Sequence, residues 1–252
     1  MTRTSQVFAS LLLLGLLTAG AVAQTSGAAR FDSAIQQKVS QQLQEMKEFR
    51  NVQASVEDGI VTLTGSVELY QQKLDAAKKI RKSANVQGVR NLLAVSSSAP
   101  DEQLAAQLQR KVYYDRMGYY DNRYNYVAVS VEDGVATLSG ATRSYIGRDS
   151  AMFIASTMPG VKDVVNNISV LPTSIYDDDI RIRATRAIYR DSALSRYAID
   201  PAAPIRIVVD NGKLSLYGTV QNTMDKQIAG IRAGEVFGVF KVENNLVVAK
   251  RG

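Results

Sequence analysis

A ten-residue segment that occurs three times constrains this chain more than any other feature of its sequence. VEDGIVTLTG at residues 56–65 returns as VEDGVATLSG at 131–140 and as VDNGKLSLYG at 209–218. Without a gap, 39 positions align in the three copies, which are residues 57–95, 132–170 and 210–248. A repeat of this length in 252 residues predicts three small domains with one fold.

Each copy begins with the pattern of a β-hairpin. Apolar residues recur at every second position before the turn, in the series Val52, Ala54, Val56, then Val127, Val129, Val131, then Ile205, Ile207, Val209. The turn dipeptides suit a type I′ turn and are Asp58-Gly59, Asp133-Gly134 and Asn211-Gly212. A second strand follows and ends on Gly65, Gly140 or Gly218. At these glycines we expect an unusual backbone conformation or a close approach by the next helix.

A helix and a third strand follow each hairpin. The helix has a face of mostly small residues, formed by Ala76, Ile80, Ser83, by Ala151, Ala155, Met158, and by Ala229, Ala233, Val236. We expect a left-handed C-cap at its end, at Asn85, Gly160 and Gly238. The third strand has an identical residue in one column, namely Asn91, Asn166 and Asn244, which we expect to bond neighbouring backbone.

A further amphipathic helix precedes each hairpin. Its apolar stripes are Ile35, Val39, Leu43, Met46, then Leu104, Leu108, Val112, then Ile180, Ala184, Ala187, Ile188. The expected N-caps are Asp32 or Ser33, Asp101, and the run Asp177-Asp178-Asp179. The predicted fold class is therefore α+β, with three tandem αββαβ units, each a three-stranded mixed sheet with two helices on one face. The predicted domains are 31–96, 101–171 and 177–249, and the short linkers between them imply that adjacent units touch.

This element order and these motifs resemble the BON domain family, named for bacterial OsmY and nodulation proteins. The segments that show it are EDGIVTLTGSV with VQGVRNLLAV, EDGVATLSGAT with PGVKDVVNNISV, and DNGKLSLYGTV with FGVFKVENNLVV. The resemblance covers about residues 31–249. It implies an exported envelope protein that interacts with phospholipid or protects against stress, without catalysis. Many members have two copies, so three copies leave the relative arrangement of the domains open.

The N-terminus has the pattern of a secretory signal peptide. Arg3 precedes an apolar run from Val7 to Leu17, and small residues end in Ala21-Val22-Ala23. We expect cleavage after Ala23, so that residues 1–23 are removed. The alternative is an uncleaved anchor helix, although the apolar run is short for a membrane span. The mature chain is then expected in the periplasm or secreted, without a transmembrane span, and peripheral membrane association stays open.

Composition excludes several function classes. The chain has no His and no Cys, which removes catalytic triads that need them and almost every transition-metal site. We therefore predict no enzyme activity, no cofactor and no metal site; calcium at Asp177-Asp178-Asp179 is a minor alternative to helix-dipole stabilisation. The net charge is +6, or +5 without Arg3, which suits an anionic surface but is low for a nucleic-acid binder.

One segment, RKVYYDRMGYYDNRYNY at residues 110–126, departs from the repeat. Tyr rings alternate there with cations, as at membrane interfaces and protein interfaces. The predicted lipid or partner contacts are Arg110, Lys111, Tyr113, Tyr114, Arg116, Tyr119, Tyr120, Arg123, Tyr124 and Tyr126. A structural role in closing the small core is the third interpretation. A second basic element is the helix with Arg181, Arg183, Arg186 and Arg190, which is typical of a solvated face and could also face a bilayer.

These observations favour a non-enzymatic exported envelope protein that supports envelope integrity or stress protection. Its predicted partner is an anionic phospholipid surface or a membrane-associated envelope protein, and not nucleic acid. Linked copies raise avidity, because later contacts become intramolecular. The alternative is a periplasmic chaperone or assembly scaffold that binds client proteins.

Overall fold

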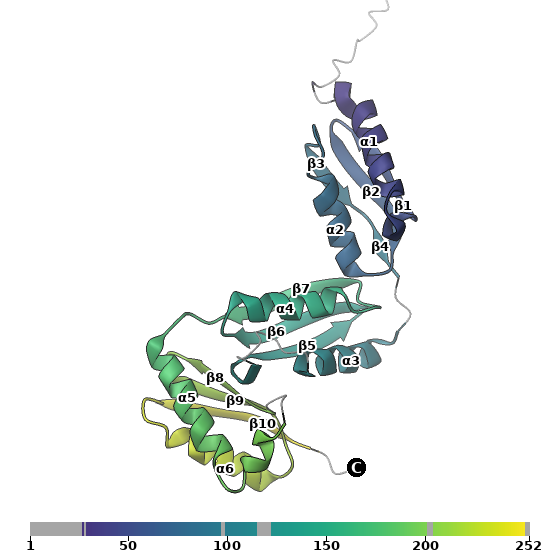
Figure 1. Cartoon of the computed structure of the whole chain (residues 1–252). Helices are drawn as coiled ribbons and strands as arrows, with labels where there is room; N and C mark the ends of the chain where they lie inside the picture. The colour runs from purple at the N-terminus through teal and green to yellow at the C-terminus, as the bar shows by residue number, and fades with distance from the viewer. Residues whose placement is uncertain (1–26, 28, 97–98, 115–121, 201–203, 250–252) are drawn as a thin grey trace, which may run out of the picture.

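Three units with the same order of elements follow one another along the chain (Figure 1). The computed structural model describes residues 27, 29–96, 99–114, 122–200 and 204–249, so the signal peptide 1–23 lies outside the described residues. The first unit contains α1 (Asp32–Gln44), β1 (Val52–Glu57), β2 (Ile60–Val67), α2 (Tyr70–Ile80), β3 (Gly88–Asn91) and β4 (Ala94–Val95). The second contains α3 (Asp101–Tyr114), β5 (Tyr126–Glu132), β6 (Val135–Thr142), α4 (Tyr145–Ser156) and β7 (Asp163–Val170). The third contains α5 (Ile175–Tyr189), β8 (Ile205–Asp210), β9 (Lys213–Val220), α6 (Thr223–Gly234) and β10 (Lys241–Val248).

Each unit forms a mixed sheet around its second strand. In the second unit β6 pairs antiparallel with β5 and parallel with β7, and in the third unit β9 pairs in the same way with β8 and β10. In the first unit β3 and β4 both pair parallel with β2, as two short pieces in the place of one strand. The predicted α+β class with three αββαβ units is confirmed.

Both helices of a unit cover the same face of its sheet. In the third unit, Ile180 and Ile188 of α5 share one buried cluster with Ala229 of α6 and with Ile207 and Leu216 of the sheet. Equivalent clusters lie in the first and second units. The predicted helix stripes are therefore core residues, except that Met46 and Ala187 are only partly buried and pack against the core. The small side chains of the second helix let it lie close to the strands.

The hairpin turns have the predicted conformation, and an acidic residue holds each of them. Both residues of every turn dipeptide have positive φ, from 48° at Asn211 to 78° at Gly134 and Gly212. The Asp32 carboxylate accepts hydrogen bonds from the amides of Asp58 and Gly59 at 2.9 and 2.8 Å. Equivalent bonds join Asp101 and Asp177 to their turns, at 2.6 to 3.0 Å. The start of the first helix is thereby fixed to the tip of the hairpin.

The predicted N-caps of all three helices are wrong, and Asp101 is already the first residue of α3. The N-cap of α1 is Phe31, and Asp32 is already its first helical residue. The N-cap of α5 is Ser174, whose hydroxyl accepts from the amide of Asp177 at 3.2 Å. The acidic residues lie inside the first turn because their carboxylates bind the hairpin amides and not the amides of their own helix.

The glycines at the ends of the second strands have φ values of 108°, 125° and 114° at Gly65, Gly140 and Gly218. A Cβ at Gly218 would lie 1.9 Å from the carbonyl oxygen of Pro204, at the entry of the first strand. The unusual backbone is as predicted, but the close neighbour is this strand entry and not the next helix. No side chain can fit at that distance.

The residues expected at helix C-caps lie further along the chain. Asn85, Gly160 and Gly238 have φ of 67°, 95° and 95°, in the left-handed range as predicted. However, α2, α4 and α6 end at Ile80, Ser156 and Gly234, so these residues form a turn between helix and strand. The left-handed residue therefore lies in the turn that follows the helix and is not the C-cap of the helix.

The asparagine column has the predicted structural role. The Asn91 side chain donates to the carbonyl of Lys73 at 2.7 Å, and Asn244 donates to the carbonyl of Lys226 at 2.7 Å. The Asn166 side chain accepts from the amide of Ile168 at 3.0 Å. In the first and third units this residue joins the last strand to the second helix.

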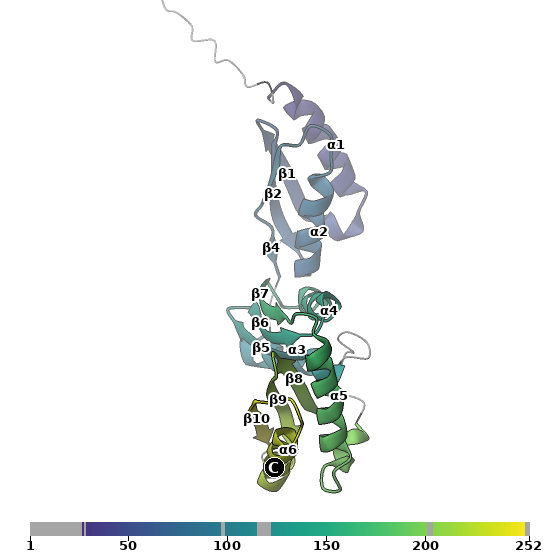
Figure 2. The ribbon, with the colours of Figure 1, turned by 90° about the vertical axis from the view of Figure 1, so that its left-hand side faces the viewer.

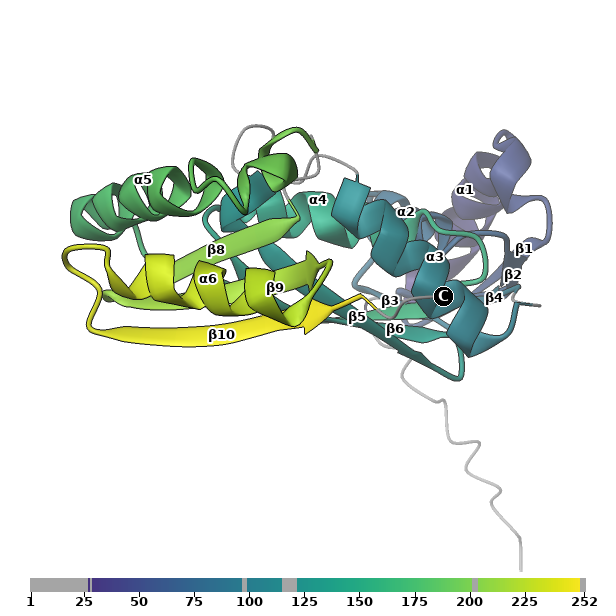
Figure 3. The same cartoon turned by 90° about the horizontal axis from the view of Figure 1, so that it is seen from below.

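The three units form an extended array in which neighbours touch (Figures 1 and 2). Between the first and second units, the Ser156 hydroxyl donates to Gln71 at 2.8 Å. Tyr70 of the first unit hydrogen-bonds Asp163 of the second, and burial together with this bond raises the pKa of Tyr70 to about 12. Between the second and third units, β8 lies beside β5 and the short helix η3 (Asn122–Tyr124), as Figure 3 shows from below.

Candidate binding sites at the second joint and at the tip of the third unit

A buried arginine anchors the joint between the second and third units. Arg206 of β8 is only 2% exposed. Its guanidinium donates to the carbonyl of Asn122 and, at 3.0 Å, to the carbonyl of Tyr113, both in the second unit. It also lies 4.8 Å from the centroid of the Tyr113 ring. Burial lowers the pKa of Arg206, and the carbonyls and the ring replace the water that the cation loses.

Aromatic contacts extend this joint. The rings of Tyr126 in β5 and Tyr217 in β9 stack with centroids 4.1 Å apart and an angle of 6° between their planes. The Tyr124 ring packs on the third core, and its hydroxyl accepts from Thr185 at 3.2 Å. The Arg123 guanidinium lies 5.9 Å from the ring of Tyr189. The described residues of the 110–126 segment therefore include several that contact the protein's own third unit.

The structure separates the ten predicted contact residues into three groups. Four contact the third unit across the joint: Tyr113, Arg123, Tyr124 and Tyr126. Three are exposed on α3: Arg110, Lys111 and Tyr114. Arg116, Tyr119 and Tyr120 lie outside the described residues. Sequence reasoning missed Arg206 and Tyr217, although both differ from the equivalent residues of the other units. The residues equivalent to Arg206 are Gln53 and Ala128, and those equivalent to Tyr217 are Thr64 and Ser139.

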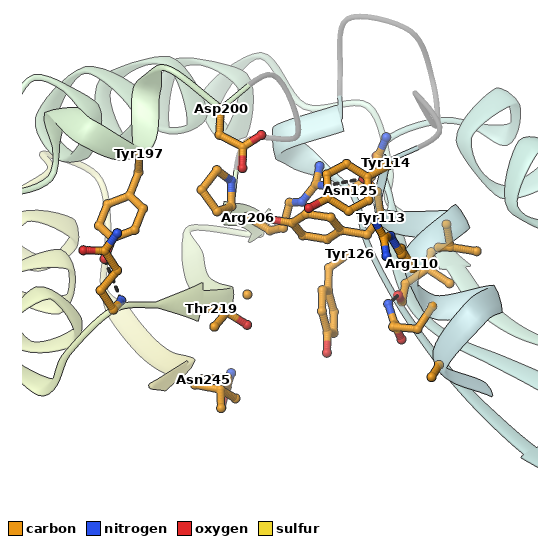
Figure 4. Close-up of a pocket in the computed structure, with 18 of the residues that line it drawn as sticks. Arg110, Tyr113, Tyr114, Asn125, Tyr126, Tyr197, Asp200, Arg206, Thr219 and Asn245 are labelled. Carbon is orange, nitrogen blue, oxygen red and sulfur yellow. Dashed lines mark hydrogen bonds between the residues drawn. The ribbon is translucent and has the colours of Figure 1, made fainter. Parts of the chain in front are cut away.

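A cavity of about 710 Å³ lies at this joint (Figure 4). Tyr113 and Tyr126 of the second unit and Tyr197 of the third contribute aromatic walls. Thr219, near the end of β9, and Asn245, within β10, contribute hydroxyl and amide groups. A cavity of this size between two domains has the usual place and volume of a small-molecule site.

The opposite end of the third sheet forms a second candidate site. Four large apolar side chains there, Ile175, Tyr176, Phe237 and Phe240, are between 74% and 85% exposed, and we call them the apolar tip. They surround the β8–β9 turn. A Cβ at Gly212 would lie 3.1 Å from the Phe240 ring, and Asp177, next to Tyr176, binds the amide of Gly212.

Lys and Arg side chains lie near the apolar tip, and several of them form ion pairs with Asp or Glu. Arg183 lies 5.6 Å from the centroid of the Phe237 ring and pairs with Asp179 at 2.5 Å. Lys213 and Lys241 both pair with Glu243, at 2.8 and 2.9 Å. These hydrogen bonds, from Lys213 first and then Lys241, lower the pKa of Glu243 to about 2. The tip is therefore apolar and nearly neutral.

The repeat alignment contains the signal that could have located the apolar tip. Phe237 occupies the column of Ala84 and Pro159. Phe240 occupies the column of Gln87 and Lys162. Only the third unit has a large ring at these two positions.

The basic helix and the acidic run both have structural partners. Arg181 is buried and donates to Asp178 and to the carbonyl of Val209, each at 2.5 Å. Asp178 also pairs with Arg143 of the second unit at 2.9 Å. Asp177 holds the hairpin turn and Asp179 pairs with Arg183, so the three carboxylates face different partners. Within the described residues, no cluster of three acidic side chains could hold a metal ion.

Known proteins share the repeat. The family model of the BON domain matches residues 31–97, 100–172 and 185–250. The chain belongs to the BON domain family. Its three BON domains correspond to the three units described above. Osmotically-inducible protein Y of Escherichia coli (strain K12) is 31% identical over 147 residues, which are 54% of this chain and 71% of that protein.

Solved structures give weaker similarities. CdsD, a structural protein of the type III secretion system of Chlamydia trachomatis, is 13% identical with a TM-score of 0.25, covering 85% of this chain and 92% of that chain. The periplasmic domain of PrgH from S. typhimurium is 11% identical with a TM-score of 0.20, covering 83% and 100%. The whole chains do not superpose at such scores. In the part of this BON protein that the structure describes, no helix has the length and hydrophobicity to cross a membrane.

Proposed function

We propose that this protein is an exported, non-enzymatic envelope protein of osmotic stress that binds anionic phospholipid surfaces through its apolar tip. Membership of the BON family and the similarity to an osmotically inducible protein support the stress role. Residues 1–23 are, in this proposal, a cleaved signal peptide that directs the chain to the periplasm or the exterior. The domains have the bounds 31–96, 101–171 and 177–249.

The observation on which the lipid contact depends is the exposure of the apolar tip. Phe237, Phe240, Ile175 and Tyr176 expose most of their surface at one end of a small domain. Monomeric soluble proteins seldom group large apolar side chains in this way unless the surface has a partner. A bilayer interface accepts such side chains, because rings settle among the head groups while the backbone stays outside.

The expected affinity for the membrane depends on the apolar surface that the tip buries in the bilayer and on the net charge of the protein. Full burial of one Phe side chain contributes about 1.5–3 kcal/mol, and partial insertion contributes less. The nearby ion pairs leave little net charge at the tip, so anionic lipid adds a modest attraction from the positive net charge of the whole chain. Binding should therefore depend more on Phe237 and Phe240 than on salt.

The 110–126 segment has a different part in this proposal. Its inward residues fix the third unit against the second, so they set the direction in which the apolar tip points. Its exposed residues Arg110, Lys111 and Tyr114 form a second and weaker lipid contact. Arg116, Tyr119 and Tyr120 belong to this second contact as sequence-based candidates.

Co-sedimentation of the mature protein with phosphatidylglycerol–phosphatidylcholine vesicles tests the proposal. The double variant Phe237→Ala with Phe240→Gln introduces the residues that the first unit has in these columns. We expect it to bind vesicles at least about tenfold more weakly, because two insertable rings are lost. Phe153→Ser, which removes an exposed ring of α4, is the matched control and should bind like the parent.

Two outcomes would contradict the proposal. A folded double variant that sediments with vesicles as well as the parent would remove the tip as the contact. A parent that ignores vesicles but suppresses aggregation of an unfolded protein would favour the chaperone alternative.

A further inference from the structure

The cavity between the second and third units is separate from the apolar tip, and among the described residues it shares only Arg110 and Tyr114 with the second, weaker lipid contact proposed above. It lies where β8 begins and where β9 and β10 end, whereas the apolar tip lies at the β8–β9 turn. The two sites therefore occupy opposite ends of the third sheet. A ligand in the cavity would contact both units at once.

The aromatic walls of the cavity offer flat faces with neutral hydroxyl groups. Tyr126 lines the cavity (Figure 4), and Tyr217 stacks on one face of its ring. Burial raises the pKa of Tyr113 to about 12 and also raises the pKa of Tyr126. Both hydroxyls therefore stay protonated near neutral pH and can donate and accept hydrogen bonds.

Among the described residues, four charged side chains line the cavity, namely Arg110, Arg196, Asp200 and Arg206. Both terminal nitrogens of Arg206 are used by carbonyls of the second unit. Arg196 pairs with Asp225, and Asp225 also accepts from the Tyr197 hydroxyl at 2.5 Å. The Arg110 guanidinium lies 5.8 Å from the centroid of the Tyr114 ring. Arg196 and Arg206 are therefore bound within the protein, and the Asp200 carboxylate offsets the charge of Arg110, so the lining suits an uncharged ligand better than an ion of either sign.

The open side of the cavity has uncharged polar side chains beside the exposed Val247. Thr219, Gln221 and Asn245 are exposed there and present a hydroxyl and two side-chain amides. An acyl chain over these groups would displace their water without replacing its hydrogen bonds, which costs free energy. A ligand with hydroxyl groups on its edges and apolar faces would satisfy both the amides and the rings.

We propose that this cavity binds a short uncharged saccharide, with sugar faces against Tyr126 and Tyr113 and sugar hydroxyls toward Thr219, Gln221 and Asn245. Its volume of about 710 Å³ accommodates two or three sugar rings within the usual range of ligand sites. Because the ligand would contact both units, saccharide binding would also stabilise the joint.

Calorimetric titration with chitotriose and with maltotriose tests this inference. We expect at least one of the two to bind the mature protein with a Kd of about 1 mM or below. Thr219→Arg places a long side chain at the open edge of the cavity, and because Thr219 is exposed the fold should persist. This variant should bind the same saccharide at least about tenfold more weakly. Thr64→Arg, at an exposed position of β2 in the first unit, should bind like the parent.

Three results would overturn the inference. One is the absence of heat from both saccharides at concentrations up to about 10 mM. Another is saccharide binding that Thr219→Arg leaves unchanged. The third is binding of glycerol 1-phosphate in place of either saccharide, which would identify a site for an anionic head group. A loss of vesicle binding in the Phe237 and Phe240 variant leaves these titrations unaffected, so the two proposals fail separately.

Discussion

The two joints of this chain differ although the three units share one fold. At the joint of the first and second units, the described contacts include one hydrogen bond from Ser156 to Gln71 and the Tyr70 contact with Asp163. At the joint of the second and third units, Arg206 is buried, two Tyr rings stack, and Arg143 pairs with Asp178. The linkers are short at both joints, so linker length does not explain the difference. Side chains that only the third unit has, together with the 110–126 segment, make the second joint the closer one.

This comparison shows how a repeat protein can fix some neighbours and leave others loosely joined. The repeat columns determine each unit, and the substitutions within those columns determine the contacts between units. The second and third units should therefore move as one body, while the first unit follows with more freedom.

The largest effect is expected from Arg206→Met, which breaks the second joint at its centre. The buried carbonyl of Asn122 and the partly buried carbonyl of Tyr113 would lose their donors, so we expect a loss of about 2 kcal/mol or more in the free energy of unfolding. Urea unfolding followed by tyrosine fluorescence measures this loss. Hydrogen exchange should show faster opening near β8 and η3 and no change in the first unit. A variant within about 0.5 kcal/mol of the parent would contradict the anchoring role.

A smaller effect is expected from Tyr217→Ser, which introduces the residue that the second unit has in this column. Loss of the stacked pair should cost about 1 kcal/mol. Combined with Tyr126→Ser, the two changes should cost less than their sum by about 0.5–1.5 kcal/mol, because each removes the same contact. Strictly additive losses in the urea unfolding of the three variants would show that the rings do not stabilise each other. Gln71→Ala at the first joint should cost less than Tyr217→Ser.

The smallest effect concerns pH. Burial opposes ionisation of Asp178, but the hydrogen bonds and charges of Arg143 and Arg181 outweigh burial and lower its pKa. A lowered pKa in the folded state adds stability above the unfolded pKa near 4, and this stability is lost as the pH falls below that value. Because the Arg143–Asp178 pair is partly exposed, its share is at most about 1 kcal/mol.

Small-angle scattering and unfolding measured from pH 6 to pH 3 test this expectation. Asp178→Asn should remove the part of the pH dependence that arises at the second joint. An unchanged pH profile in this variant would show that the pair does not contribute.

Much of each unit follows from local sequence patterns. Asn-Gly and Asp-Gly dipeptides allow positive φ at both turn residues, and alternating valines need one buried face, so hairpin and sheet were predictable. The role of Asp32, Asp101 and Asp177 was not predictable in the same way. An acidic residue at a helix start indicates a cap, whereas these carboxylates bind a turn about 26 to 35 residues later in the chain.

The candidate sites were only partly accessible to sequence reasoning. The Tyr and Arg residues of the 110–126 segment predict a lipid contact, a partner contact or a role in closing the small core, and composition alone cannot distinguish these three. Sequence reasoning did not find the apolar tip, although its two Phe residues occupy repeat positions at which the other units have no aromatic residue. Exposure is a property of the folded chain, so the columns could show that these rings are unusual but not that they reach solvent.

The sequence by itself determined the number of units, their order of elements and their hairpin turns, because these depend on interactions between residues close in the chain and on the repetition of one pattern. The tertiary structure decided which side chains remain exposed and how the units join. Arg206 meets the carbonyls of Tyr113 and Asn122 from more than 80 residues away. Such contacts depend on how whole domains pack together, and local propensity and periodicity do not predict that packing.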